Sequence, residues 1–141
     1  MVGLRRAGLG CVAGLVAVIA LAGCVPFGVA CPAVGWSNSL IVELYGDTSS
    51  VELVQVCTDD GCAPAADIDP TGPLGLVAAE QQDDSTWTLQ LGMMAADYLT
   101  VRALDVAGLV LADAEVTPEW VRVGGDARCG GPAEATVALH L

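Results

Sequence analysis

A hydrophobic period of two residues constrains the fold of this chain more than any other feature of its sequence. Apolar residues alternate with others in four segments: 40–44, 87–91, 99–103 and 110–116. An extended strand turns successive side chains to opposite faces, so this alternation is typical of strands with one face in a core and the other in solvent. The pattern predicts half-buried antiparallel strands and no long amphipathic helix.

Further strand candidates and the turns between them predict the architecture. The additional candidates are 51–57 and 136–141 and, more weakly, 74–79 and 120–123, for a total of seven or eight strands. Turn-forming residues occur at Asp47, Asp59 and Asp105 and their neighbours. Short strands at such intervals predict an all-β fold, one small antiparallel β-sandwich over residues 31–141.

The beginning of the chain has the layout of an export signal. Arg5 and Arg6 form a basic start, residues 7–20 are apolar, and a Leu-Ala-Gly-Cys motif ending at Cys24 follows at once. This order is typical of a bacterial signal peptide that ends in a lipobox. We therefore predict a signal peptide over residues 1–23, lipidation of the Cys24 thiolate with a diacylglyceryl group, and a lipidated tether over residues 24–30.

The N-terminal segment has two alternative interpretations besides a lipid anchor. Residues 7–30 carry no charge and are long enough to span about 30 Å as a helix, although Pro26 and the glycines weaken that helix. The other alternative is an ordinary secretory signal that happens to contain a cysteine. In each case the folded part leaves the cytoplasm. With the lipid anchor it stays on the extracytoplasmic face of the cell membrane, because two or three acyl chains give stable attachment.

The exported part is strongly acidic. Removal of the first 23 residues leaves 118 of the 141, with three Arg, no Lys and all 17 acidic residues, a formal charge of −14. Such a charge favours solubility and repels phosphate groups, which argues against nucleic acid as a partner. We expect a solvated acidic surface, with cationic ligands or basic proteins as alternative partners.

Four cysteines remain once Cys11 leaves with the signal and Cys24 is acylated: Cys31, Cys57, Cys62 and Cys129. Outside the cytoplasm such an even set is expected to form disulfides, with three connectivities open. Cys57 and Cys62 flank a four-residue hairpin loop, so a local bridge is the natural pairing, and Cys31 is left for Cys129. A zinc or redox site is the alternative, but the chain has no Cys-x-x-Cys and only one histidine.

An acidic loop over residues 59–72 suggests an alternative function, the binding of a ligand or cation. Asp67, Asp69 and Gly72 resemble the opening of a calcium-binding loop, in which oxygen ligands alternate. The twelfth position of such a loop is Ala78 instead of the bidentate Glu, and Pro70 stiffens the turn. Asp67 and Asp69 are therefore weak metal candidates, and we expect no metal and no cofactor.

No group of residues identifies a reaction. Asp83 and Asp84 are adjacent, and adjacent side chains on a strand point to opposite faces, where they cannot readily cooperate in acid–base work. His140 is expected to face outward near the end of the chain, with no nucleophile elbow to accompany it. Trp87 is expected in the core. We therefore expect no catalytic residue and a protein that is not an enzyme.

Two cysteine motifs resemble a pattern found in small uncharacterised lipoproteins of high-GC Gram-positive bacteria. One runs from Cys31 to Trp36 shortly after the lipobox, and the other runs from Cys129 to Pro132 before the last strand. The resemblance covers nearly the whole chain. It implies a lipid-anchored, disulfide-bonded β-sandwich of the immunoglobulin-like or carboxypeptidase-regulatory-like kind. The expected function is a non-enzymatic binding or structural module of the cell envelope, whose partner is an unknown envelope protein or ligand.

Overall fold

The computed structural model describes residues 30–64 and 77–141, which contain nine strands and no helix. The strands are β1 (Ser39–Tyr45), β2 (Leu53–Thr58), β3 (Gly61–Ala63), β4 (Ala78–Asp83), β5 (Thr86–Gln90), β6 (Leu99–Leu104), β7 (Val110–Val116), β8 (Val121–Arg122) and β9 (Ala133–His140). The chain divides into two compact units, Met1–Cys31 and Pro32–Leu141, and these strands belong to the second. Over the described ranges, no helix has the length and apolar character needed to cross a membrane.

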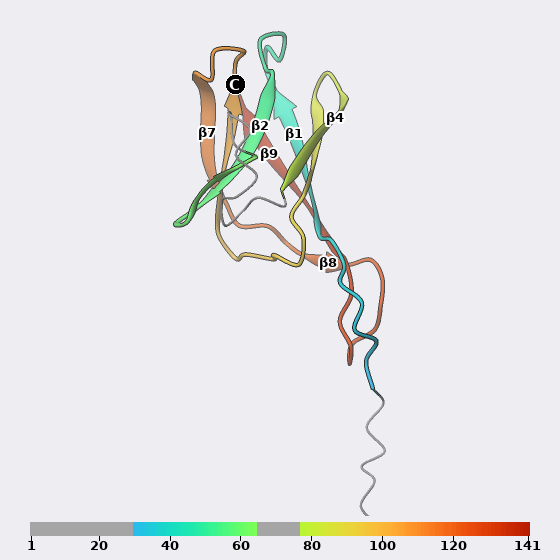
Figure 1. Ribbon diagram of the computed structural model, residues 1–141. Helices are drawn as coiled ribbons and strands as arrows, with labels where there is room; N and C mark the ends of the chain where they lie inside the picture. The colour runs from blue at the N-terminus through green and yellow to red at the C-terminus, as the bar shows by residue number, and fades with distance from the viewer. Residues whose placement is uncertain (1–29, 65–76) are drawn as a thin grey trace, which may run out of the picture. The chain divides into compact units, whose positions relative to one another are not determined.

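The strands of the second unit form two sheets that share one core (Figure 1). One sheet has five strands in the order β4-β5-β1-β9-β8, and the other has four in the order β3-β2-β6-β7. The fully buried core side chains come from both sheets and include Leu40, Leu89, Leu139, Val54 and Val101. The predicted all-β sandwich is confirmed.

The middle strand of the larger sheet, β1, shows why the alternating pattern works. Leu40, Val42 and Leu44 all point into the core, and β1 pairs antiparallel with β5, which buries Trp87 as expected. The other neighbour, β9, runs parallel to β1 from the pair Ser39–Glu134 to the pair Tyr45–His140. This parallel pair differs from the purely antiparallel arrangement that we expected. It can form because the whole domain between the two strands serves as the long crossover that parallel neighbours require.

Strands β3 and β4 depart from the sequence prediction, whereas β2 lies where the candidate 51–57 was expected. Strand β2 is buried at every position from Val54 to Cys57, so no alternation marks it. Strand β3 has only three residues, too few to show a period. Strand β4 starts at Ala78 and runs on to Asp83, displaced from the predicted segment 74–79, whose residues 74–76 lie outside the described ranges. It is a polar strand at the border of its sheet, where charge discourages pairing with other chains.

Strand β7 also lies at the border of its sheet, and this position limits its burial. Its alternation is as predicted, with Asp113 and Glu115 exposed between residues that face inward. The inward side chains Ala112 and Ala114 are only partly buried against the core. A strand with one hydrogen-bonded neighbour is covered from one side only, so the start of β7 remains accessible to solvent.

Candidate functional site

Three residues singled out by the sequence, Cys24, Asp67 and Asp69, lie outside the described residues. The lipid anchor and the weak calcium site therefore stay predictions. The described part of the acidic loop, residues 59–64, begins with the turn between β2 and β3, where the Asp60 amide donates to Thr58 Oγ1 at 3.3 Å. Within residues 30–64 and 77–141, no group of three or more His, Cys, Asp or Glu side chains is placed to hold a metal ion.

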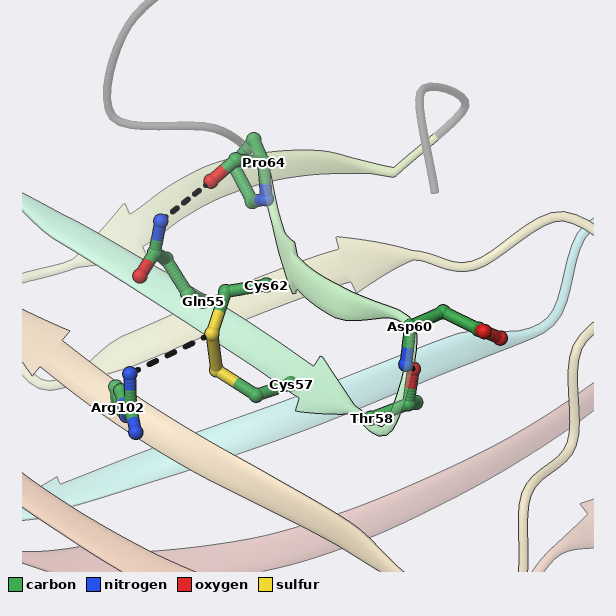
Figure 2. Close-up of a disulfide and its surroundings, with 7 residues drawn as sticks. All are labelled: Gln55, Cys57, Thr58, Asp60, Cys62, Pro64 and Arg102. Atoms are coloured by element: carbon green, nitrogen blue, oxygen red, sulfur yellow. Dashed lines mark hydrogen bonds between the residues drawn. A yellow bond between two sulfur atoms is a disulfide. The ribbon is translucent and has the colours of Figure 1, made fainter. Parts of the chain in front are cut away.

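A disulfide joins β2 to β3 (Figure 2). Cys57 and Cys62 occupy opposite positions in this antiparallel pair, which is the local bridge that the hairpin spacing predicted. Two polar side chains lie beside the bridge. Arg102 Nη1 is 3.5 Å from Cys62 Sγ, and Gln55 Nε2 donates to the Pro64 carbonyl at 2.7 Å. These contacts hold the end of the smaller sheet together.

Cys31 and Cys129 are each disulfide-bonded as well. Their pairing with one another stays a prediction from the sequence. Zinc is bound by the thiolate form of cysteine, which a disulfide sulfur cannot provide. While these four cysteines remain oxidised, none of them is available as a zinc ligand.

The turn between β6 and β7 is ordered and apolar. One carboxylate oxygen of Asp105 accepts the amide hydrogens of Ala107 and Leu109, each at 2.8 Å. The Asp105 amide in turn donates to the Leu109 carbonyl at 3.0 Å, which closes the turn. Val106 is nevertheless 86% exposed and Leu109 is 65% exposed. The turn therefore holds two branched apolar side chains out in solvent on a well-connected backbone.

The apolar surface continues into the first residues of β7. Val110 and Leu111 are also exposed, so four apolar side chains within six consecutive residues face solvent. We call Val106, Leu109, Val110 and Leu111 the apolar tip. The connections from β1 to β2 and from β4 to β5 lie at the same end of the sandwich, because Leu53 pairs with Leu104 and the Leu44 amide donates to the Ser85 carbonyl.

His140 lies at this end too, and its surroundings are simple. Its ring stacks on Tyr45, with ring centroids 5.1 Å apart, at the ends of the paired strands β1 and β9. The Tyr45 hydroxyl donates to Glu43 Oε2 at 2.8 Å, and this hydrogen bond and the Glu43 charge raise the pKa of Tyr45. His140 is exposed, as the alternation predicted.

Several of the acidic residues cap turns. Asp47 Oδ1 accepts from the amide and hydroxyl of Ser49, and Asp83 Oδ1 accepts in the same way from Ser85. These hydrogen bonds favour the charged form and lower the pKa of both carboxyls. Each of these carboxylates therefore caps its own turn and keeps its negative charge at the surface.

The opposite end of the sandwich is a clamped structure that we call the base, residues 32–38 and 121–133. In Figure 1 the loop after β8 runs beside the segment that leads into β1. A Cβ atom on Gly130 would lie 3.0 Å from Trp36 Cη2, and one on Gly125 would collide with the Gly130 carbonyl. Both glycines have positive φ, 78° and 67°. Only glycine permits this combination of left-handed backbone and close approach.

Polar groups hold the base loop in place. Asp126 Oδ1 accepts the amide hydrogens of Cys129 and Arg128, each at 2.8 Å, and Arg122 Nη1 donates to the Asp126 carbonyl at 3.1 Å. The amide of Cys129, then that of Arg128, lowers the pKa of the Asp126 carboxyl, and the Arg122 charge adds to the effect. The buried Asn38 side chain accepts from the Ala133 amide at 2.8 Å, which ties the entering segment to β9.

Neither the apolar tip nor the base followed from the sequence pattern, although signals for both were present. The run Val-Ala-Gly-Leu-Val-Leu, residues 106–111, comes directly after a turn-forming Asp, where side chains are placed on the surface. Glycine pairs at 124–125 and 130–131 bracket a four-residue segment, and paired glycines often mark a close backbone approach.

Comparison with known proteins adds no assignment to this geometry. The chain matches no family model, no curated protein and no solved structure.

Proposed function

We propose that this protein is a non-enzymatic lipoprotein, anchored on the extracytoplasmic face of the cell membrane, that binds a partner in the cell envelope. The anchor is supported by the Leu-Ala-Gly-Cys motif that ends at Cys24 after the apolar segment 7–20. The binding role is supported by the apolar tip. That tip is the single observation that carries the proposal, because it presents exposed apolar side chains on a turn whose backbone is fixed by hydrogen bonds.

The apolar tip has the properties of a contact surface. Isolated apolar side chains are common on protein surfaces, but several exposed ones in one turn and the start of the next strand often mark a site of interaction. Full burial of a Val or Leu side chain contributes about 1.5–3 kcal/mol, so Val106 and Leu109 together offer substantial binding free energy. The Asp105 hydrogen bonds already order the turn, which reduces the entropy lost on binding.

The charge around the apolar tip indicates the kind of partner. Asp47, Asp83 and Asp105 all lie in turns at this end of the sandwich. The matching surface would have an apolar pocket with basic residues around it, because complementary charge steers association and excludes wrong partners. We therefore propose a protein partner with this combination.

The residues that could perform chemistry support a binding role over catalysis. His140 is stacked on Tyr45, the Asp83 carboxylate is engaged by Ser85, and Cys57 and Cys62 are joined to each other. A general base needs a nucleophile or substrate proton within hydrogen-bond reach. None of these groups has such an arrangement with another described residue.

Site-specific photo-cross-linking of the full chain in its own cells tests the binding role. A photoreactive amino acid at Val106 should yield a discrete adduct, and the same group at the exposed Glu80 on β4 should not. Leu109→Ser should weaken the Val106 adduct, whereas Gln81→Ser should leave it unchanged. An absence of adducts at Val106, or the same adducts from both positions, would contradict the binding role.

A further inference from the structure

The base differs in charge from the rest of the described chain. Its residues, 32–38 and 121–133, contain Arg122 and Arg128 against Asp126, a formal charge of +1. The other described residues contain 14 acidic side chains against Arg102, a formal charge of −13. Glu119 and Glu134 lie at the border of the base, and Glu134 pairs with Val121 of β8. Two of the three described arginines therefore lie in the base, which is close to neutral, while the rest of the described chain forms a strongly acidic body.

The base also carries exposed apolar side chains. Val34 is 67% exposed, and Val121 and Val123 of the β8 segment are 64% and 61% exposed. Trp36 is partly buried against Gly130 in the same region. Arginine, tryptophan and small apolar residues together are typical of surfaces that meet the interfacial region of a bilayer.

Chain length brings this end close to the membrane. If Cys24 carries the lipid, the eight Cα–Cα steps from Cys24 to Pro32 span at most about 29 Å when fully extended. The base contains Pro32 and is therefore the part of the sandwich that the tether keeps nearest to the bilayer. The apolar tip lies at the opposite end of the strands.

We propose that the base rests on an anionic phospholipid surface, with Arg122 and Arg128 near the headgroup phosphates and Val34, Val121 and Val123 in the interfacial layer. This inference depends on the proposed lipid anchor at Cys24. The acidic body is repelled by the same surface and points away from it, which directs the apolar tip toward the envelope. At physiological salt the electrostatic potential of the lipids is screened over about 8 Å. It therefore acts on the base but hardly on most of the acidic body.

Fluorescence of the acylated mature protein in vesicles tests this orientation. An environment-sensitive fluorescent amino acid is placed at Val123 or at Leu109, two positions of similar exposure at opposite ends. The vesicles contain equal parts of phosphatidylcholine and phosphatidylglycerol, with or without bromine-labelled acyl chains. We expect a blue shift and bromine quenching at Val123 and neither at Leu109. Emission at Val123 that stays unshifted and unquenched, or equal responses at both positions, would overturn the inference.

Charge variants test the kind of lipid that is recognised. Arg128→Gln removes one positive charge from the base and should reduce quenching at Val123 in vesicles with phosphatidylglycerol. Gln81→Glu changes the net charge by the same amount on the distant, exposed strand β4 and should leave the quenching unchanged. Quenching should also fall in vesicles of phosphatidylcholine alone. If neither Arg128→Gln nor the lipid charge alters it, an anionic surface is not the partner.

Flotation of the same samples separates this inference from the proposed function. Protein that floats with the vesicles but shows no quenching at Val123 counts against contact between the base and the membrane, but not against the lipid anchor. Acylated mature protein that does not float with vesicles counts against the anchor, and the inference fails with it.

Discussion

The two ends of the sandwich use the same local chemistry in different surroundings. At the apolar tip, Asp105 accepts the amides of Ala107 and Leu109, and at the base, Asp126 accepts the amides of Arg128 and Cys129. Each turn also needs a glycine with positive φ. A Cβ atom on Gly108 at the tip would meet nothing within 4 Å, whereas one on Gly125 would collide with the Gly130 carbonyl.

The two turns differ in their surroundings. An aspartate-capped turn with open space around it can present apolar side chains to solvent. One that is packed against its neighbours can fix the segment that leads into the first strand. The capping interaction is therefore common to both ends, and the two ends differ in the packing around it.

Loss of a disulfide should be most costly at the base. If Cys31 pairs with Cys129, that bridge closes about a hundred residues and contributes about 4.7 kcal/mol in the loop-entropy model, against about 2 kcal/mol for the six-residue loop of Cys57 and Cys62. Chemical denaturation should therefore show a larger loss of unfolding free energy for Cys129→Ser than for Cys62→Ser. Peptide mapping without reduction that links Cys31 to Cys57 or Cys62 would contradict the pairing.

Alanine substitution of the two turn glycines should separate strain from collision. Gly108→Ala places a side chain in left-handed backbone with open space around it, so we expect a cost of about 1–2 kcal/mol. Gly125→Ala adds the collision with the Gly130 carbonyl and should lower the free energy of unfolding further. Equal effects in thermal or chemical unfolding would show that the base is not packed as described.

Acid should loosen the base through Asp126. Its pKa is lowered in the folded protein by the amides of Cys129 and Arg128, so its stabilising effect is fully present above the unfolded pKa of about 3.9. The effect is lost as the pH falls through the lower folded pKa. The protection factor of the Cys129 amide, its exchange rate compared with the intrinsic rate at the same pH, should fall over this range in the wild-type protein. Asp126→Asn should remove this particular pH dependence, and an unchanged profile would show that another group is responsible.

Substitution of the apolar tip should hardly affect stability. The double variant Val106→Ser and Leu109→Ser changes two exposed side chains. Each substitution should therefore change the free energy of unfolding by no more than about 0.5 kcal/mol. The Glu80→Ser variant on β4 is the control. A large loss of stability would mean that the tip belongs to the core after all, and its exposure could no longer be taken as evidence for a partner.

Half-buried strands were predictable from the sequence, because alternation directly reports which face meets the core. Segment 40–44 lies in β1 and segment 99–103 lies in β6, while segment 87–91 covers most of β5 and the residue that follows it. The alternate apolar residues of all three segments are buried. Strand β2 has no such signal because both of its faces are covered at Val54 to Cys57. Strand β3 is defined by its partner and the disulfide and not by a pattern of its own.

The candidate surfaces were harder to predict, because alternation does not reveal whether the inward face of a strand is fully covered. Val110 occupies an inward phase of the pattern, yet it is exposed at the border of its sheet. The base depends on contacts between residues far apart in the chain, such as Trp36 with Gly130 and Asn38 with Ala133. The turn residues and the local disulfide could be predicted because their partners lie only a few residues away.

The mass of the N-terminal peptide of the mature protein, isolated from cell membranes, tests the lipid anchor directly. Anchoring by lipid predicts a peptide that begins at Cys24 and carries a diacylglyceryl group, and Cys24→Ser should abolish both the cleavage and the lipid. A mature chain that begins at another residue, or a Cys24 peptide without lipid, would contradict the anchor and the orientation of the base and apolar tip that depends on it.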